Sequence, residues 1–303
     1  MLAAALLAAL TGAPGPVAAA APLTVCLDEN LPPWSVRHGA GGDGFDLRVA
    51  EQVAQHLGRA LRVQWFGSRL DEDASTTLAA DALLSDGKCD LVGGYPLLRD
   101  ALGKPGLAAA RLPDFAGATP ADRGRRIALG TLVPTRPYHR AVFVVLLGPT
   151  ATKPVNSLAG LDGLRLGVED GTLADAVLMT WAGGRLVDHI THLVPGRGEL
   201  LPDLEQGAFD ATLVELRRFD AWRAAHNDSR IRLSGYRSPI GFNIGFVGLS
   251  TEAPLIDAAG RAIGDLVAGG ELPALARASG VTYTAPTGPD VLEHLTMHDL
   301  ARE

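Results

Sequence analysis

Residues 158–172, with the sequence LAGLDGLRLGVEDGT, contain the clearest folding signal of the chain. Within them, residues 164–168 form a short apolar run that is typical of a buried strand. This run leads through Glu169 and Asp170 to Gly171 and Thr172, and an alanine- and leucine-containing helical segment follows. Glycine permits a tight turn, and threonine caps helix N-termini. The order strand–turn–helix predicts an α/β protein in which a helix N-terminus faces the end of a strand.

Strand-like and helix-like segments alternate on both sides of this stretch. Such alternation predicts parallel strands joined by right-handed crossovers. Residues 96–133 show little periodicity, which predicts an insertion or a mobile flap. The predicted strands are residues 23–27, 61–66, 89–93, 141–147, 164–168, 190–194, 211–215 and 231–233, and the predicted helices are residues 45–57, 76–85, 173–181, 199–206 and 255–279.

Two extended segments divide the predicted elements into two lobes. The chain crosses from the first lobe to the second near residues 137–141, and it returns near residues 238–241. The first lobe is therefore predicted to comprise residues 22–138 and 241–303, and the second lobe residues 139–240. This organisation predicts a central cleft between the lobes, which closes on a ligand by a hinge motion.

Composition excludes several classes of protein. The 303 residues carry a formal net charge of -7, which argues against a nucleic-acid binder. Residues 1–21 are rich in alanine and leucine and end in small residues, so we interpret them as a secretory signal peptide. An uncleaved anchor is the alternative, although Gly12 and Pro14 leave the run short for a membrane span. The signal peptide predicts a periplasmic protein.

Seven short motifs follow one another in an order that resembles a known family. They are Pro32-Pro33-Trp34, Gly44-Phe45-Asp46, the run Cys89-Asp90-Leu91-Val92-Gly93-Gly94, Arg136-Pro137-Tyr138-His139, residues 157–172, residues 207–211 and the acidic Glu215. Over residues 23–280 this order is similar to the type 2 periplasmic solute-binding proteins of ABC transporters, the family 3-like group. The resemblance implies a monomeric α/β binding protein of periplasmic binding protein type II, with two lobes, a small polar ligand and an ABC permease as partner.

One departure from the family pattern leaves a second function open. Amino-acid-binding members place a T-P-E-R motif, whose arginine holds the ligand carboxylate, where this chain has Tyr95-Pro96-Leu97-Leu98-Arg99. Free amino acids are therefore expected to bind weakly. The cysteine-containing strands and the Thr135-Arg136-Pro137-Tyr138 crossover resemble accessory proteins of periplasmic quinoprotein (methanol) dehydrogenases. An accessory protein that binds or assists such a dehydrogenase is the alternative function.

The predicted ligand site combines aromatic walls with charged groups. Aromatic side chains provide large rigid contact surfaces, and packing within the protein is their alternative role. Arg136 would hold an anion or form a salt bridge at the hinge. Glu215 ends a parallel strand, where open α/β sheets bind ligands, and would hold a cation unless it is a surface carboxylate. The predicted ligand-binding residues are Trp34, Tyr95, Arg136, Tyr138, Glu169, Gly171, Thr172 and Glu215.

No catalytic, cofactor or metal site is predicted. The sequence suggests no Ser-His-Asp or Cys-His grouping, so we expect no enzyme and no cofactor. His294 and His298 are four residues apart on a predicted helix, but no third ligand lies nearby.

The two cysteines, Cys26 and Cys89, are predicted to stay unpaired. Export favours oxidation, but in neighbouring parallel strands Cys26 would lie late and Cys89 at the start. That offset corresponds to roughly 10 Å along the strands, beyond the roughly 7 Å that a disulfide allows between Cα atoms.

Overall fold

The computed structural model describes residues 20–39, 41–67, 76–194 and 199–293. Nearly all of the predicted signal peptide, residues 1–21, lies outside the described residues, as do His294 and His298. Every helix within the described ranges is too short or too polar to cross a membrane.

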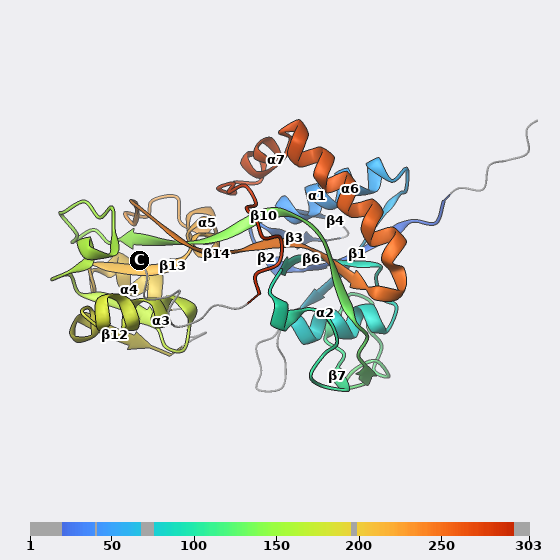
Figure 1. The fold of residues 1–303 in the computed structure, drawn as a ribbon, viewed down its shortest axis with the longest axis horizontal. Coiled ribbons are helices and arrows are strands. Elements are labelled where there is room, and N and C mark those ends of the chain that lie inside the picture. The colour runs from blue at the N-terminus through green and yellow to red at the C-terminus, as the bar shows by residue number, and fades with distance from the viewer. Residues whose placement is uncertain (1–19, 40, 68–75, 195–198, 294–303) are drawn as a thin grey trace, which may run out of the picture.

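The strands of the described chain form one large mixed sheet and two small ones. The strands of the large sheet are β1 (Leu23–Asp28), β5 (Leu61–Gly67), β6 (Leu91–Pro96), β8 (Asp114–Phe115), β10 (Leu132–Leu147), β11 (Leu166–Glu169), β12 (Ile190–Leu193), β13 (Ala211–Glu215) and β14 (Arg232–Leu249). Their order is β12-β11-β13-β10-β14-β6-β1-β5-β8. Figure 1 labels β12, β13, β10, β14, β6 and β1 of this sheet. The small sheets comprise β2 (Asn30–Leu31), β3 (Ser35–His38) and β4 (Gly41–Asp43), and β7 (Ala109–Arg111) with β9 (Arg126–Ala128).

The helices follow the strands closely in the sequence. They are α1 (Phe45–His56), α2 (Thr76–Ser85), α3 (Leu173–Thr180), α4 (Leu200–Gln206), α5 (Leu216–Ala225), α6 (Ala253–Gly269) and α7 (Leu272–Ala278). The helical run predicted over residues 255–279 is thus two helices. Helix α5 was not predicted.

The first lobe buries its sheet on both faces because successive strand residues point to opposite sides. Leu23, Val25 and Leu27 of β1 pack with residues of α1, α6 and α7. Cys26 points to the other face, where α2 packs. The segment predicted as an insertion or flap contributes Ala110 of β7 and other buried residues to this second cluster. That segment is therefore packed onto the first lobe.

The second lobe repeats this arrangement around β10. Phe143, Val145 and Leu147 pack with residues of α3 on one face. The alternate residues of the same strand, from Val142 to Leu146, pack with α4 and α5 on the other face. The lobes thus have separate hydrophobic clusters, and among the described residues only the half-buried Phe242 packs against a cluster in each.

Two long antiparallel strands carry the chain between the lobes. β10 pairs with β14 from Leu132 opposite Leu249 in the first lobe to Leu147 opposite Arg232 in the second (Figure 1). The predicted crossing segments, residues 137–141 and 238–241, lie within these two strands. The boundaries predicted for the lobes, residues 22–138, 139–240 and 241–303, stay predictions.

The chain after α7 runs back along the crossing strands. The backbone N–H of Thr282 donates to Asp220 of α5 over 2.8 Å. Further along, the side-chain amide of Asn243 in β14 donates to the carbonyl of Thr287 over 2.8 Å. This segment is the part of the chain coloured red beside β10 and β14 in Figure 1.

Cys26 and Cys89 form a disulfide, so the prediction of unpaired cysteines was wrong. Their Cα atoms are 5.6 Å apart. The prediction placed Cys89 in the extended strand, whereas it lies in the loop between α2 and β6. Because that loop does not continue the line of β6, the offset along the strands does not measure the separation of the two residues.

Candidate ligand cleft

Two adjoining cavities lie where the lobes meet. The apolar cavity has a volume of about 400 Å³, and its lining includes Phe143, Glu169, Thr172, Leu173, Leu200 and Leu213. The aromatic cavity has a volume of about 390 Å³, and its lining includes Pro32, Trp34, Asp46, Phe66, Tyr95 and Arg217. Glu215, Arg218 and Phe242 line both cavities. The two cavities therefore adjoin and share part of their walls, and together we call them the cleft; residues of both lobes border it.

Glu215 stands at the junction of the two cavities. It is the last residue of β13 and the N-cap of α5, so the end of the strand fixes its position. Its side chain is 24% exposed, but its Oε1 atom is buried and finds no hydrogen-bond partner within the described residues. Burial raises the pKa of Glu215, and the nearby charges of Arg217 and Arg218 counteract this shift. Within the described residues, Oε1 of Glu215 is thus a buried acceptor without a donor.

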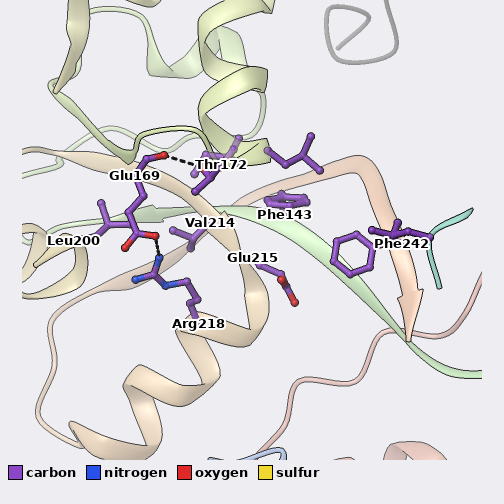
Figure 2. A pocket seen from close by; sticks show the side chains of 12 residues that line it. Phe143, Glu169, Thr172, Leu200, Val214, Glu215, Arg218 and Phe242 are labelled. Atoms are coloured by element: carbon purple, nitrogen blue, oxygen red, sulfur yellow. Dashed lines mark hydrogen bonds and ion pairs between the residues drawn. The ribbon is translucent and has the colours of Figure 1, made fainter. Parts of the chain in front are cut away.

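Glu169 and Arg218 face each other in the apolar cavity. The Arg218 guanidinium, on α5, donates to Oε2 of Glu169 at the end of β11. Figure 2 shows this ion pair together with the bond from Thr172 to Glu169. In that bond the Thr172 hydroxyl donates to the Glu169 carbonyl over 2.8 Å. Glu169 and Arg218 therefore have protein partners in the cleft.

At the start of α3, some of the backbone N–H groups have acceptors within the protein. Gly171 adopts φ 70°, a left-handed conformation that favours glycine. Oγ1 of Thr172 accepts a hydrogen bond from the Asp175 N–H over 3.2 Å. The Asp175 carboxylate in turn accepts from the Gly171 N–H over 3.0 Å. This reciprocal capping uses the N–H groups of Gly171 and Asp175 within the protein, so neither is left for a ligand.

Trp34 forms a wall of the aromatic cavity. Its side chain is 1% exposed, and its Nε1 donor has no acceptor within the described part of the chain. The guanidinium carbon of Arg217 lies 4.6 Å from the centre of the Trp34 ring. Arg217 belongs to the second lobe and Trp34 to the first, so this cation–π contact bridges the cleft.

A buried polar cluster lies behind Trp34. The His139 ring centre is 4.7 Å from that of Trp34. Burial lowers the pKa of His139 to about 3, and the Arg217 charge acts in the same direction. Asp46 accepts a hydrogen bond from Tyr138, and burial raises the pKa of Asp46 to about 6 against the opposing effect of Arg217. Arg217 thus influences the protonation of both groups.

The structure brings five of the eight predicted site residues to the cleft. Trp34, Tyr95, Glu169, Thr172 and Glu215 line its cavities. The hydroxyl of Tyr95 donates to the Ala101 carbonyl over 2.6 Å, so this group has a partner.

The other three predicted site residues lie elsewhere. Gly171 is exposed in the turn before α3. Tyr138 is completely buried within the first-lobe cluster. Arg136 is exposed, and its side chain lies beside Gly260 and Gly264 of α6. None of the three lines either cavity.

Sequence reasoning missed Arg217 and Arg218. Both lie in the first turn of α5, which contains no acidic residue. The positive end of a helix dipole ordinarily favours acidic residues, and cations there are unfavourable. Two adjacent arginines that begin two residues after a strand-ending glutamate are therefore the signal that would have indicated them.

Within the described ranges, no group of three or more His, Cys, Asp and Glu side chains is arranged to hold a metal ion.

The fold is similar to that of solved binding proteins. The L-cystine solute receptor of Neisseria gonorrhoeae in its unliganded open conformation is 16% identical, with a TM-score of 0.60 over 88% of this chain and 96% of that chain. The second of the substrate-binding domains of a protein assigned as an amino acid ABC transporter of Streptococcus pneumoniae is 16% identical. Its TM-score is 0.59 over 84% of this chain and 98% of that chain. A histidine kinase sensor domain similar to periplasmic binding proteins is 15% identical, with a TM-score of 0.54 over 88% of this chain and 98% of that chain.

At these identities the likenesses establish the fold and not the function. The chain has the two-lobed α/β fold of type II periplasmic binding proteins, which confirms the predicted fold class. The sequence matches no family model and no curated protein. The structures named above are receptors, binding domains and sensors rather than enzymes. They give no support to the dehydrogenase-accessory interpretation, which stays an untested prediction.

Proposed function

We propose that this protein is an extracytoplasmic solute-binding protein, which captures a small polar ligand between its lobes and presents it to an ABC permease. Solved proteins of this fold include an L-cystine receptor and a substrate-binding domain of an amino acid transporter. The cleft lies between the lobes and is lined by both. A ligand there contacts both lobes at once, so its binding stabilises one relative orientation of the lobes.

The observation that carries the proposal is the unpartnered carboxylate oxygen of Glu215. A buried acceptor without a donor costs free energy, and native structures rarely retain one. A ligand that brings an ammonium or another N–H donor to this oxygen would recover that free energy. Because Glu215 lines both cavities, such a ligand would occupy the junction between them.

The disulfide supports a location outside the cytoplasm. Disulfides form and persist in oxidising compartments such as the bacterial periplasm, and Cys26 is paired with Cys89. Together with the predicted signal peptide of residues 1–21, the disulfide favours periplasmic delivery of the solute to a membrane permease.

The proposal is tested by ligand binding to the purified protein. Thermal-shift screening with small polar solutes, followed by calorimetry, should identify a ligand that raises the unfolding temperature. Glu215→Gln keeps the shape of the side chain and removes its charge. We expect this variant to bind roughly tenfold to a hundredfold more weakly.

Glu51→Gln is the matched control, because Glu51 is exposed on α1 outside both cavities. Its affinity should equal that of the wild type. If no small solute stabilises the wild-type protein, the proposed function is wrong.

A further inference from the structure

Arg217 occupies an unusual position in the cleft. It is the second residue of α5, and it lines the aromatic cavity. Its side chain is 16% exposed, and its Nε lies 3.7 Å from Oε1 of Glu215. Its guanidinium lies on the face of Trp34. The guanidinium is therefore held in place from two sides and largely shielded from water.

The guanidinium of Arg217 has N–H groups that no acceptor of the described residues binds. Arginine carries five N–H donors, yet within the described residues no hydrogen-bond acceptor reaches the Arg217 side chain; the Glu215 contact is an ion pair beyond hydrogen-bond distance. Within the same part of the chain, the buried Nε1 of Trp34 is a second donor without an acceptor, and Trp34 lines the same cavity. Arg218 differs, because Glu169 already accepts from it. Among the described residues, donors without a protein acceptor thus lie together at Arg217 and Trp34.

The start of α5 adds to the positive potential of this wall. The N-terminus of a helix carries a partial positive charge, and α5 begins at Leu216 without an acidic residue in its first turn. A cation in this position weakens the helix rather than stabilising it. A bound anion would interact favourably with the guanidinium and with the helix terminus.

We propose that Arg217 is the residue that binds the anionic group of the ligand, and that it selects ligands with a carboxylate. A planar guanidinium held flat against an aromatic ring can present two parallel N–H groups to a carboxylate. Because Glu215 lies beside it, an ammonium next to that carboxylate would meet the unpartnered Oε1. The ligand class is therefore a small zwitterion with its two charges on neighbouring groups. This inference rests on the proposed function.

Arg217 takes the place of the arginines that the sequence suggested. Arg136 lies against α6, and Arg99 is paired with Glu293. The expectation that free amino acids bind weakly depended on the missing first-lobe arginine. Arg217 supplies a guanidinium from the second lobe instead.

A purely structural role for Arg217 makes a different prediction. As a counter-charge for Asp46 and Glu215, Arg217 would affect the stability of the protein and not its preference for a carboxylate. Calorimetry with the free L-amino acids and their carboxamides separates the two roles, because each carboxamide keeps the ammonium and loses the negative charge. The wild type should bind at least one amino acid roughly tenfold or more tightly than its carboxamide.

Arg217→Met should abolish this preference, and Arg217→Lys should retain part of it, because lysine keeps the charge without the planar fork. Arg62→Met is the control, since Arg62 is exposed on β5 outside both cavities, and it should keep the full preference. An unchanged preference in folded Arg217→Lys would overturn the assignment, as would equal binding of acid and carboxamide by the wild type. If other solutes bind and no amino acid does, this inference fails while the proposed function stands. If no solute binds at all, both fail.

Discussion

Tyr138 donates its phenolic hydrogen to Oδ1 of Asp46 over 2.9 Å, and both side chains are buried within the first lobe. The phenolic oxygen in turn accepts from the Gly94 N–H over 2.8 Å. Asp46 also lines the aromatic cavity. A carboxyl group that the sequence placed in a helix start therefore belongs to the floor of the cleft, where its protonation affects both stability and the charge next to Arg217.

The free energy of unfolding should depend on pH through Asp46. Burial raises its pKa from 3.8 to about 6. Between pH 3.8 and about pH 6, the folded protein therefore keeps a proton on Asp46 that the unfolded chain has released. Its contribution to stability is complete below pH 3.8 and is lost as the pH rises through about 6. Asp46→Asn should remove this loss and stabilise the protein at pH 7 by up to roughly 3 kcal/mol.

Urea unfolding of both proteins between pH 4 and pH 7 measures the effect. Asp257→Asn is the control, because Asp257 is exposed on α6, and its pH profile should match that of the wild type. A profile of Asp46→Asn parallel to the wild type would show that Asp46 is charged throughout.

His139 should act in the opposite direction. Burial lowers its pKa to about 3, so the folded protein keeps it neutral while the unfolded chain takes up a proton below about pH 6.5. The contribution of His139 to stability is present above pH 6.5 and is lost as the pH falls toward 3. Between about pH 4 and pH 6 it therefore offsets the effect of Asp46.

His139→Gln should unmask the Asp46 effect, so that stability falls more steeply with rising pH across this interval. His38→Gln, an exposed position on β3, should leave the wild-type profile unchanged. An NMR titration of the ring protons gives a direct check, since a His139 signal that titrates near pH 6.5 contradicts the prediction.

Loss of the disulfide should destabilise the protein substantially. Cys26 and Cys89 are 63 residues apart. Closing a loop of this length lowers the conformational entropy of the unfolded chain, which stabilises the folded state by about 4 kcal/mol. The wild-type protein should show no free thiol after denaturation without reductant. A reductant should lower its unfolding temperature and leave that of the double variant Cys26→Ala/Cys89→Ala unchanged. Two labelled thiols in the unreduced wild type would refute the pairing.

Gly44 should be intolerant of a side chain. It has φ 123°, and a Cβ atom there would lie 2.3 Å from the carbonyl oxygen of Trp34. Gly44→Ala must therefore strain its backbone and displace the Trp34 loop, at a cost of roughly 1–3 kcal/mol. Gly87→Ala is the control, because its φ is also positive, at 67°, but a Cβ there meets no atom within 4 Å.

Chemical denaturation compares the two glycine variants, and ligand binding shows whether the Trp34 wall moves. Equal losses of stability in the two variants would mean that the contact with Trp34 is relieved without cost.

Regular elements were predictable where local patterning determines them. The strand at residues 61–66 and the helix at residues 76–85 were predicted to within one residue of their ends. Their patterns of apolar and polar residues are local features, which can be read from the sequence alone. The long strand β14 was predicted as a strand only at residues 231–233 and as an extended crossing at residues 238–241, since its glycines and Pro239 obscure the strand pattern. Its extended conformation comes from pairing with β10, a contact between distant segments.

Side-chain roles were harder to predict than strands. Glu215 was placed correctly at the end of a strand, because the strand end is a local feature. Arg136 was predicted and Arg217 was missed, since which of them reaches the cleft depends on the direction in which each residue leaves its element. Arg136 points toward α6, whereas Arg217 is carried back over Trp34 by the turn into α5. The cysteine pairing likewise depended on the path of a loop.

The pairing of β10 with β14 determines how the lobes can move. Its register shifts at four places, between Pro134 and Pro137, between Pro137 and His139, and twice between Val142 and Leu146. The same two strands belong to both lobes, and together they form a two-stranded hydrogen-bonded ribbon. A rotation of one lobe against the other therefore twists this ribbon, and the ribbon resists the twist elastically. Interruptions of the ladder lower that resistance locally. The mechanical compliance of the molecule is therefore concentrated along the ribbon, so substitutions there would alter opening and closing rates without touching a ligand.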